Sequence, residues 1–515
     1  MDELIAELRQ RQAASLELGG ASRVERQHNQ GKLTARERIA LLFDDGSFEE
    51  LGQLATHVYT PVTTIPNKHT PADGVVTGFG KIEGRQAAVV AEDFTILGGS
   101  LGINNFIKKT RMIELAQRDK LPIVWLFDGA GARTDEFIGE GLAPMHHFMD
   151  IAKLSGVTPQ IAGVLGPCAG DSSLLPAMME FIVMVEGTAM LAAGGPPLVK
   201  MGTGEDVTKE ELGGTDLHCR ISGVADNRAV DDADAIRQIR RYLSYMPTNT
   251  YEYPPYVEPE DSPDRRDEDL AGILPENKRR PYDMMKIINK VVDQDSFFEI
   301  KPDFAKMMIT GLARMNGHAV GIIANQPKVM AGAITAAAGG KHRHFMDLCN
   351  AFHLPIIFLM DAPGVMTGPQ SEKEGALRAG MTIAHSFAFA RVPLLTLTIH
   401  KGFGYGAAAM GGLGAGQSTT LAWPNADFNA IPLDSGIQAA YRALLEAADD
   451  PEAEQARLEA ELGALCGAFP AAEQMKIDDI IEPAATRPRL IQALERALTH
   501  RTQAPVPATR WGILP

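Results

Sequence analysis

Cysteine is scarce in this chain, and the few that occur are far apart. They are Cys168, Cys219, Cys349 and Cys466 in a sequence of 515 residues. No CxxC pair and no histidine at zinc-finger spacing accompanies them, which excludes a structural zinc ribbon, and we expect no metal to be bound by this chain. Isolated cysteines are typical of reduced thiols, so we expect a cytoplasmic protein.

A surplus of basic residues and a long apolar run are also missing. Asp and Glu (65) outnumber Lys and Arg (49), which gives a formal net charge of −16. This balance argues against a nucleic-acid surface, because neutralising phosphates requires clustered cations. The longest apolar runs, such as 356–360, have the length of a strand and are too short to cross a bilayer. We therefore expect no nucleic-acid partner and no membrane association.

Common acid–base and nucleotide motifs are absent too. The sequence has no HExxH metal motif and no GxxxxGK[ST] phosphate loop. The pair His146-His147 falls in a helical stretch, where a surface or packing role is expected. Asp128 and Asp361 end apolar runs, where a carboxylate is expected to cap the following turn. The pattern favours a site made of backbone dipoles, whose proton transfers are performed by a substrate or cofactor.

The sequence repeats itself at a nearly constant spacing. The run LPIVWLFD at 121–128 returns as LPIIFLMD at 354–361, which lies 233 positions later. The same spacing relates Thr77 to Thr310, Gly84 to Gly317, Lys108 to Lys341 and Arg111 to His344. The glycine-rich segment 166–170 falls on 400–404 at a spacing of 234. Agreement of this many landmarks predicts an internal duplication.

The duplication divides the chain into two expected domains, 1–255 and 256–515. A segment rich in proline and acids, 247–280, separates them and is expected to be an exposed linker. Residues 23–44 are expected to form a solvated helix, and 436–500 to be largely helical.

Within each half, short apolar runs alternate with helical stretches. The expected strands include 86–90 and 320–324, and the expected helices include 105–118 and 344–352. Apolar strands followed by glycine-rich turns and helices indicate an α/β fold whose sheets are covered on both faces.

Glycine-rich turns follow the expected central strands in both halves. They are DGAGAR at 128–133, GPCAGD at 166–171, DAPG at 361–364 and GFGYGA at 402–407. Glycine lets the backbone approach a ligand closely, and a helix that begins there directs unpaired N–H groups outward. Two such donors that converge on one oxygen stabilise an oxyanion by about 3–4 kcal/mol each. A lone turn of this kind is usually only a turn, but four at matched positions favour a functional role.

Many short strings of the sequence resemble one enzyme family. They are GKLTARER at 31–38, DGVVTG at 73–78, DFT at 93–95, GGS at 98–100, PQI at 159–161, GPCAG at 166–170, EELGG at 210–214, ANQP at 324–327 and AWP at 422–424. Together they resemble the carboxyltransferase (β) subunit of biotin-dependent acyl-CoA carboxylases, the group that contains propionyl-CoA and methylcrotonyl-CoA carboxylases. The resemblance extends from about Arg23 to Arg487.

The resemblance implies a fold, a reaction and partners. The fold is two tandem crotonase-like (ClpP/crotonase) domains, with acyl-CoA on the N-terminal and biotin on the C-terminal one. The oligomer is a hexamer, a trimer of dimers. Biotin is carried by a partner α subunit that holds biotin carboxylase and the biotin carboxyl carrier, since this chain has no Met-Lys-Met acceptor. In the family, carboxybiotin releases CO2, and the biotin so formed takes a proton from the acyl-CoA. The thioester enolate then attacks CO2 through its α or γ carbon.

The resemblance also implies site residues by position. The first oxyanion hole is formed by the amides of Gly170 and Asp171, and the second by those of Tyr405 and Gly406. The CoA-binding residues are Gly98, Gly99, Ser100, Lys108, Arg111, Gly131, Ala132 and Arg133, although solvated side chains are an equally good interpretation of Lys108 and Arg111. The biotin-binding residues are Gly364, Phe403 and Gly404.

Several positions depart from the family, among them Ala130 and Ile431-Pro432, and two of the departures are candidates for substrate choice. Asp171 stands where a second glycine is usual, and Ala408 stands where a polar selector is common. Both are candidate determinants of the acyl group. Two alternative functions remain open, namely the α subunit of a biotin-dependent acyl-CoA decarboxylase and a catalytically weak CoA-binding scaffold subunit.

Overall fold

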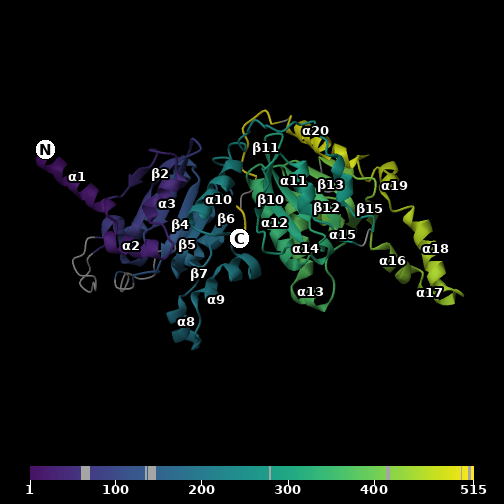
Figure 1. Ribbon diagram of the computed structural model, residues 1–515, viewed down its shortest axis with the longest axis horizontal. Helices are drawn as coiled ribbons and strands as arrows, with labels where there is room; N and C mark the ends of the chain where they lie inside the picture. Colours follow the sequence, from purple (N-terminus) through teal and green to yellow (C-terminus); the bar gives the residue numbers. More distant parts are fainter. Residues whose placement is uncertain are drawn as a thin grey trace. The chain divides into compact units, whose positions relative to one another are not determined.

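The computed structural model describes residues 1–58, 70–133, 136, 146–277, 280–412, 418–499, 501–508 and 512–515. The chain forms two compact units (Figure 1). Unit 1 comprises Met1–Glu252 with Thr509–Pro515, and unit 2 comprises Tyr253–Ala508. The boundary falls inside the segment that is rich in proline and acids.

Unit 1 is built on one eight-stranded sheet in the order β1-β2-β3-β4-β5-β6-β8, with β7 paired to β5. The strands are β1 Glu49–Leu51, β2 Val75–Ile82, β3 Arg85–Glu92, β4 Ile123–Gly129, β5 Gln160–Ala169, β6 Phe181–Val185, β7 Met190–Ala192 and β8 Asn227–Ala229. The pairs β1–β2 and β2–β3 are antiparallel, and the pairs from β3 onward are parallel. Every residue of β4 is buried, as expected for a central parallel strand covered on both faces.

Unit 2 repeats this topology strand for strand. Its sheet has the order β9-β10-β11-β12-β13-β14-β16, with β15 paired to β13. The strands are β9 Phe298–Ile300, β10 Met308–Met315, β11 His318–Asn325, β12 Ile356–Ala362, β13 Leu394–Phe403, β14 Thr419–Ala422, β15 Asp427–Asn429 and β16 Asp479–Ile480. The predicted α/β fold with an internal duplication is therefore confirmed.

The two sheets also share an irregularity between their central strands. The register shifts between Phe127 and Gly129 in β4, and between Met360 and Ala362 in β12. In each unit the residue between these positions is an aspartate, Asp128 or Asp361 in chain order. The pairing is therefore irregular at the same place in both units, near the carboxyl ends of the strands, where ligands bind in open α/β sheets.

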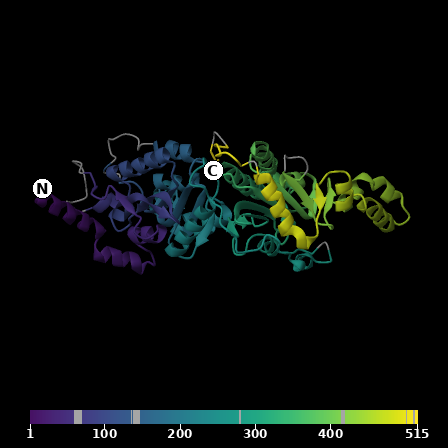
Figure 2. The same ribbon diagram turned by 90° about the horizontal axis from the view of Figure 1, so that it is seen from above.

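Helices cover both faces of each sheet (Figures 1 and 2). Those of unit 1 are α1 Asp2–Leu16, α2 Ala21–Asn29, α3 Ala35–Leu42, α4 Ile103–Asp119, α6 His146–Leu154, α7 Asp171–Leu174, α8 Pro196–Thr203, α9 Lys209–Gly213 and α10 Asp232–Tyr245. The helices α4 and α6 share one core with β2–β6, whereas α10 packs with α3 and against β5 and β6.

Unit 2 follows the same plan. Its helices are α11 Met284–Val291, α12 Ala336–Ala351, α13 Pro369–Lys373, α14 Ala376–Phe389, α15 Gly404–Ala409, α16 Leu433–Ala440, α17 Arg442–Ala447, α18 Pro451–Gly463, α19 Ala468–Glu473 and α20 Thr486–Leu498. The helices α11 and α20 share a core with the central strands, and α12 packs with α14 and against β10 and β11. The largely helical character predicted for 436–500 is confirmed.

The solvated helix predicted for 23–44 is wrong in two respects. The segment forms two helices, because a capping box between Thr34 and Glu37 starts α3 anew. The second helix is not solvated, since Arg38 is fully buried. The many charged residues suggested an exposed helix, but Arg38 has buried partners.

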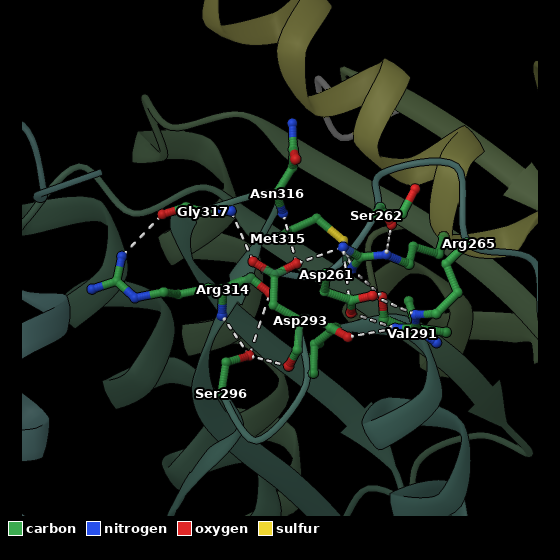
Figure 3. A network of polar contacts seen from close by, with 12 residues as sticks. Asp261, Ser262, Arg265, Val291, Asp293, Ser296, Arg314, Met315, Asn316 and Gly317 are labelled. Carbon is green, nitrogen blue, oxygen red and sulfur yellow. Dashed lines mark hydrogen bonds and ion pairs between the residues drawn. The ribbon is translucent and has the colours of Figure 1, made fainter. Parts of the chain in front are cut away.

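A polar network surrounds Asp293 in unit 2 (Figure 3) and has an equivalent in unit 1. The carboxylate of Asp293 accepts hydrogen bonds from the amide of Gly317 at 2.8 Å and from the Arg487 guanidinium at 2.7 Å. In unit 1, Asp44 accepts equivalent bonds from the Gly84 amide at 2.8 Å and from Arg240 at 3.2 Å. Arg240 and Arg487 belong to α10 and α20, so the last helix of each unit is duplicated as well.

The segment 247–280 is not simply an exposed linker. The carboxylate of Asp261 is bound by Arg265 (Figure 3). Arg265 also donates to the Val292 carbonyl at 3.0 Å. Leu270 is buried in the core of unit 2. The many prolines and acids suggested exposure, but ion pairs and the apolar side chains of Leu270, Ile273 and Leu274 fasten this segment to unit 2. Among the residues described, no helix has the length and apolar character that a membrane span requires.

Candidate active site

The loop around Gly98 and the turn after β4 form one cluster. The amide of Ala130 donates to the Gly98 carbonyl at 2.9 Å, and that of Leu101 donates to the Gly131 carbonyl at 2.8 Å. Gly99 has a φ of 64° and packs against the Asp128 carbonyl, so a side chain would not fit there. We call Gly98, Gly99, Ser100, Gly131, Ala132 and Arg133 the glycine cluster. All six are residues that the sequence predicted to bind CoA, and the structure brings them together.

The predicted first oxyanion hole lies beside the glycine cluster. Gly170 has a φ of 69° and precedes α7. A Cβ at Gly131 would lie 3.4 Å from the Ala169 carbonyl, whereas one at Gly170 would meet no atom within 4 Å. Gly170 therefore has free space beside its Cα, directly before the first turn of α7, where backbone N–H groups lack intrahelical acceptors. The side chain of Asp171 lies outside the described part of the chain, so its selector role stays a prediction.

The guanidinium of Arg133 faces the protein. It donates to the Ser100 hydroxyl at 3.0 Å, to Asp73 at 2.6 Å, to Glu136 at 2.9 Å and to the Ser100 carbonyl at 2.9 Å. These bonds occupy its donors, and the residue is buried. Arg133 thus fixes the glycine cluster from behind, and the geometry does not support a direct contact between its side chain and CoA.

Ser100 also occupies the serine position of a GxSxG string, GGSLG at 98–102. Such a string marks a serine nucleophile when a histidine base is in reach. Here the Ser100 hydroxyl donates to the Leu97 carbonyl at 2.7 Å and accepts from Arg133. Both interactions are structural, so this serine is not placed as a nucleophile.

Lys108 is likewise turned inward. Its ammonium donates to the Ala72 carbonyl at 3.0 Å and to that of Val75, and the side chain is buried. Its duplicate Lys341 donates to the carbonyls of Lys301 and Met308, both at 2.7 Å. A shared structural role explains both lysines, and the phosphate contact predicted for Lys108 is not supported by this geometry.

Arg111 remains exposed on α4. It forms an ion pair with Glu114 at 3.2 Å, one turn further along the same helix. An exposed pair of this kind contributes little to stability, about 0.5 kcal/mol. The solvated side chain, which the sequence left open as an alternative, is therefore a sufficient account of Arg111.

The predicted second oxyanion hole forms the first turn of α15. A Cβ at Gly406 would lie 2.7 Å from the Cα of Gly364, so the two glycines are in backbone contact. Gly404 has a φ of 52° and approaches the Ala430 carbonyl closely. The Tyr405 hydroxyl donates to the Gly380 carbonyl at 2.6 Å, which holds the ring against α14.

These contacts gather the residues predicted to bind biotin beside the second hole. Phe403 is buried at the end of β13, directly before Gly404. A Cβ at Gly364 would meet no atom within 4 Å, so a ligand can approach the backbone there. Ala408 lies half-buried in α15, one turn beyond Gly404. The selector role of Ala408 stays a prediction.

Asp128 does not cap the turn after β4, and that prediction is wrong. Its carboxylate accepts from the Lys32 ammonium at 2.5 Å, from Arg38 at 2.9 Å and from the Gln27 amide at 3.0 Å. Arg38 also donates to Asp232 of α10 at 2.8 Å. All the ionised groups of this network are buried. It fastens α2, α3 and α10 to the strand end that carries the glycine cluster.

Asp361 likewise does not cap the next turn. It accepts from the Lys401 amide of β13 at 3.1 Å, and the Nδ1 atom of His400 lies 3.7 Å from its second oxygen. Burial raises the pKa of Asp361, but the nearby His400 imidazole and the charge of Lys401 outweigh it and hold the pKa below its usual value. Asp361 therefore joins the ends of β12 and β13 at the irregularity in the sheet.

One buried ion pair of unit 1 has no charged counterpart in unit 2. The Lys109 ammonium donates to Glu92 at 2.7 Å. At the matching positions unit 2 has His342 and Asn325. His342 is buried, its ring stacks on Phe358, and its nitrogens have no hydrogen-bond partner of ordinary geometry among the described residues. Burial lowers its pKa to about 4, although the carbonyl of Ala409 in α15 opposes the shift.

We expect His342 to make unit 2 sensitive to acid. Its pKa is about 4 in the folded chain and 6.5 ordinarily, so between these pH values only the unfolded chain binds the proton. Stability should fall as pH falls from 6.5 to 4, by on the order of 3 kcal/mol for this residue. Between pH 7 and pH 5, the melting temperature of His342→Leu should therefore fall less than that of the wild type.

The matched control is His385→Leu, because His385 is exposed on α14 in the same unit. This variant should keep the pH dependence of the wild type. Equal pH dependence in the His342 variant and the wild type would contradict the assignment.

The chain is similar to proteins of established activity. The model of the carboxyl transferase domain family matches residues 26–511. The carboxyltransferase subunit of propionyl-CoA carboxylase from Haloferax mediterranei is 39% identical over 510 residues, which cover 98% of each chain. The α subunit of methylmalonyl-CoA decarboxylase from Veillonella parvula is 39% identical over 483 residues, 94% of this chain and 93% of its own.

A solved structure agrees with these sequence relatives. Transcarboxylase 12S, crystallised as a hexamer with methylmalonyl-CoA and methylmalonic acid bound, superposes with a TM-score of 0.92 at 36% identity. The match covers 100% of this chain and 98% of that one. As its sequence strings predicted, the chain therefore belongs to the carboxyl transferase domain family.

Proposed function

We propose that the chain is the carboxyltransferase component of an acyl-CoA carboxylase, and that it moves CO2 from carboxybiotin to an acyl-CoA. One observation carries the proposal. Each unit has a glycine-lined helix start, at Gly170 in unit 1 and at Gly404–Gly406 in unit 2. Each start follows the irregular strand ends of its own unit. In a family of carboxyl transferases, two such starts supply two oxyanion holes.

The chain's part in the reaction is electrostatic. The amides of Gly170 and Asp171 are proposed to donate to the thioester oxygen, and those of Tyr405 and Gly406 to the ureido oxygen of biotin. Each donor placed on a developing oxyanion stabilises the transition state by about 3–4 kcal/mol. Biotin, when bound, supplies the CO2 and the base. The open backbone at Gly364 and the unpaired first turn of α15 fit a ureido oxygen.

The partners belong to the same proposal. Biotin is expected on a separate α subunit that holds biotin carboxylase and the carrier. A homohexamer is supported by the hexameric assembly of transcarboxylase 12S. Apolar side chains on the α16–α18 region, namely Ile431, Leu444 and Leu465, are exposed in the single chain. Association of copies would remove such side chains from water.

Carboxylation by the assembled enzyme is the direct test. The chain and its biotin-carrying partner are incubated with ATP, labelled bicarbonate and a panel of acyl-CoAs. We expect label to enter a carboxylated acyl-CoA in a reaction that avidin blocks. If the partner's biotin is carboxylated but no acyl-CoA of the panel gains label, the proposal fails.

A decarboxylase α subunit is the second candidate, because the relative from Veillonella parvula is 39% identical. The two functions differ in direction and partner. Net release of CO2 from a carboxylated acyl-CoA, coupled to a membrane-bound partner, would favour the decarboxylase. A chain that binds acyl-CoA with neither activity would favour the scaffold subunit.

Asp171→Gly tests the proposed selector. A carboxylate beside the thioester repels an anionic enolate, whereas glycine restores the pair that is usual in the family. We expect the ratio of kcat/KM values among acyl-CoAs to shift by about tenfold toward short unbranched chains. Asp171→Asn, which removes only the charge, should shift the ratio in the same direction. An unchanged substrate profile in both variants would show that Asp171 does not select.

A further inference from the structure

A hollow of about 370 Å³ lies in unit 2 near the carboxyl ends of β13 and β14. His400 of β13 lines it, and so do Trp423 and Pro424, which follow β14 directly. The segment that leads into α11 contributes Leu274 and Tyr282. The carboxyl ends of parallel strands are where ligands bind in open α/β sheets. The volume is also typical of small-molecule sites, which occupy about 300–1,000 Å³.

This hollow is separate from the residues predicted to bind biotin. Its lining does not include Gly364, Phe403 or Gly404. Ala407 of α15 lines a different and smaller cavity. A molecule in the hollow would therefore be a further ligand of unit 2, and its binding requires neither biotin nor acyl-CoA.

The buried carboxylate beside the hollow lacks the partners that its duplicate has. In unit 1, Asp128 accepts hydrogen bonds from a lysine, an arginine and a glutamine. In unit 2, Asp361 accepts from the Lys401 amide through Oδ1. Its Oδ2 atom has no hydrogen-bond partner of ordinary geometry in the described part of the chain. Unit 2 therefore keeps the carboxylate without the buried cations that surround it in unit 1.

His400 connects that carboxylate to the hollow. Its Nδ1 atom lies 3.7 Å from Oδ2 of Asp361, and the side chain is buried. In a neutral imidazole one nitrogen carries the proton, and a carboxylate near Nδ1 favours the proton there. The other nitrogen, Nε2, is then a hydrogen-bond acceptor. Asp361 thus orients a ring that presents an acceptor to the hollow.

The other walls of the hollow are mainly apolar. Trp423 is held in place because its indole N–H donates to the Thr486 hydroxyl at 2.9 Å. Tyr282 is buried, and burial together with the charge of Asp361 raises the pKa of its hydroxyl. The tyrosine is therefore neutral near pH 7. Two aromatic rings favour a ligand with a planar apolar body.

The charges around the hollow disfavour an anion. Glu276 and Arg280 line it but are exposed and opposite in sign, so solvent screens both. The buried charge near the hollow is that of Asp361, whose pKa is held below its usual value. A ligand that carries a carboxylate would meet this charge through His400, whereas a hydrogen-bond donor would be attracted.

We propose that this hollow binds a small uncharged molecule with a planar apolar body and an N–H donor, such as an aromatic amide. The donor binds Nε2 of His400, and the body packs on Trp423 and Tyr282. The strand that carries His400 continues into Gly404 and the first turn of α15. A ligand in the hollow would therefore contact the strand that leads to the second oxyanion hole.

Saturation-transfer NMR on the purified full-length chain tests the proposal with benzamide and benzoate, which have the same shape. Benzamide should bind. Benzoate should bind about tenfold more weakly, because it has no donor and carries the charge that Asp361 repels. Neither measurement involves carboxyl transfer, so the result does not depend on the proposed function.

Two variants locate the binding. His400→Phe keeps a ring of similar size and removes the acceptor, so benzamide should bind about tenfold more weakly, as expected for the loss of one buried hydrogen bond. Toluene, which needs no acceptor, should bind this variant and the wild type equally. Ala271→Trp, at an exposed lining position in the turn Glu268–Ile273, should fill the hollow and abolish the binding of both compounds.

The matched controls are His385→Phe on α14 and Ala443→Trp on α17, which replace exposed residues that do not line the hollow. Both should bind benzamide like the wild type. Equal affinity for benzamide and benzoate would overturn the proposal, and so would benzamide binding that survives Ala271→Trp. Unchanged benzamide binding in His400→Phe, or a parallel loss of toluene binding there, would remove His400 as the acceptor and overturn it as well.

Discussion

Replacing Gly406 with valine is expected to lower carboxyl transfer by about a thousandfold or more. A Cβ at this position would lie 2.7 Å from the Cα and 3.0 Å from the nitrogen of Gly364. Both are backbone atoms, so the side chain cannot be accommodated by a rotamer change. Either the first turn of α15 or the turn after β12 must move, and with it the amides proposed to hold the biotin oxygen.

The change in Gly406→Val is local, so assembly and CoA binding should remain intact. Turnover is measured together with the oligomeric state by gel filtration. Gly340→Val is the matched control, because Gly340 is an exposed helical glycine of the same unit whose Cβ would meet nothing within 4 Å. It should keep normal turnover. Normal turnover in a properly assembled Gly406→Val enzyme would remove the second oxyanion hole from the mechanism.

Replacing Arg38 with leucine is expected to destabilise unit 1 by about 3–5 kcal/mol. The guanidinium pairs with Asp128 at 2.9 Å and with Asp232 at 2.8 Å, and all three groups are buried. Removing the cation leaves two carboxylates near each other in a region of low dielectric constant. Urea unfolding of the purified chain, followed by the fluorescence of buried Trp125 in β4, should show the loss.

Arg237→Leu is the control for that experiment. Arg237 lies in α10 like Asp232, but its pair with Asp234 is exposed to solvent. Exposed pairs contribute about 0.2–1 kcal/mol, so the control should change the free energy of unfolding by no more than that. Similar losses in the two variants would mean that burial of the Asp128 network does not decide its contribution.

The duplication and the strands could be predicted from sequence because their signals are local. A largely apolar run of eight residues such as 121–128 predicts a buried strand, and glycines predict the positions of tight turns. The residues of the glycine cluster were grouped by the resemblance to the carboxyltransferase family, because no local signal links GGS at 98–100 to the turn after β4. The four glycine-rich turns could be predicted from composition and spacing alone, and in the structure they follow matching strands of the two units.

The direction of charged side chains could not be predicted. Lys108 and Arg133 were expected to face a ligand, yet their partners are carbonyls and carboxylates of the protein. The Asp128 network joins residues about one hundred positions apart, and a sequence shows each charge without showing what it faces. The string GKLTARER was the local sequence signal for the Asp128 network, since it contains Lys32 and Arg38, which are buried partners of Asp128.

The paired lysines also carry a record of descent. Lys108 donates to the Val75 carbonyl and Lys341 to the carbonyl of Met308, its counterpart in unit 2, so this contact was present in the single-unit ancestor before its gene was copied. The Lys109–Glu92 pair, which corresponds to His342 and Asn325, marks a change made after the copies diverged. Contacts that both units share stabilise the fold. Contacts that differ between the units reflect the different functions that the two units acquired.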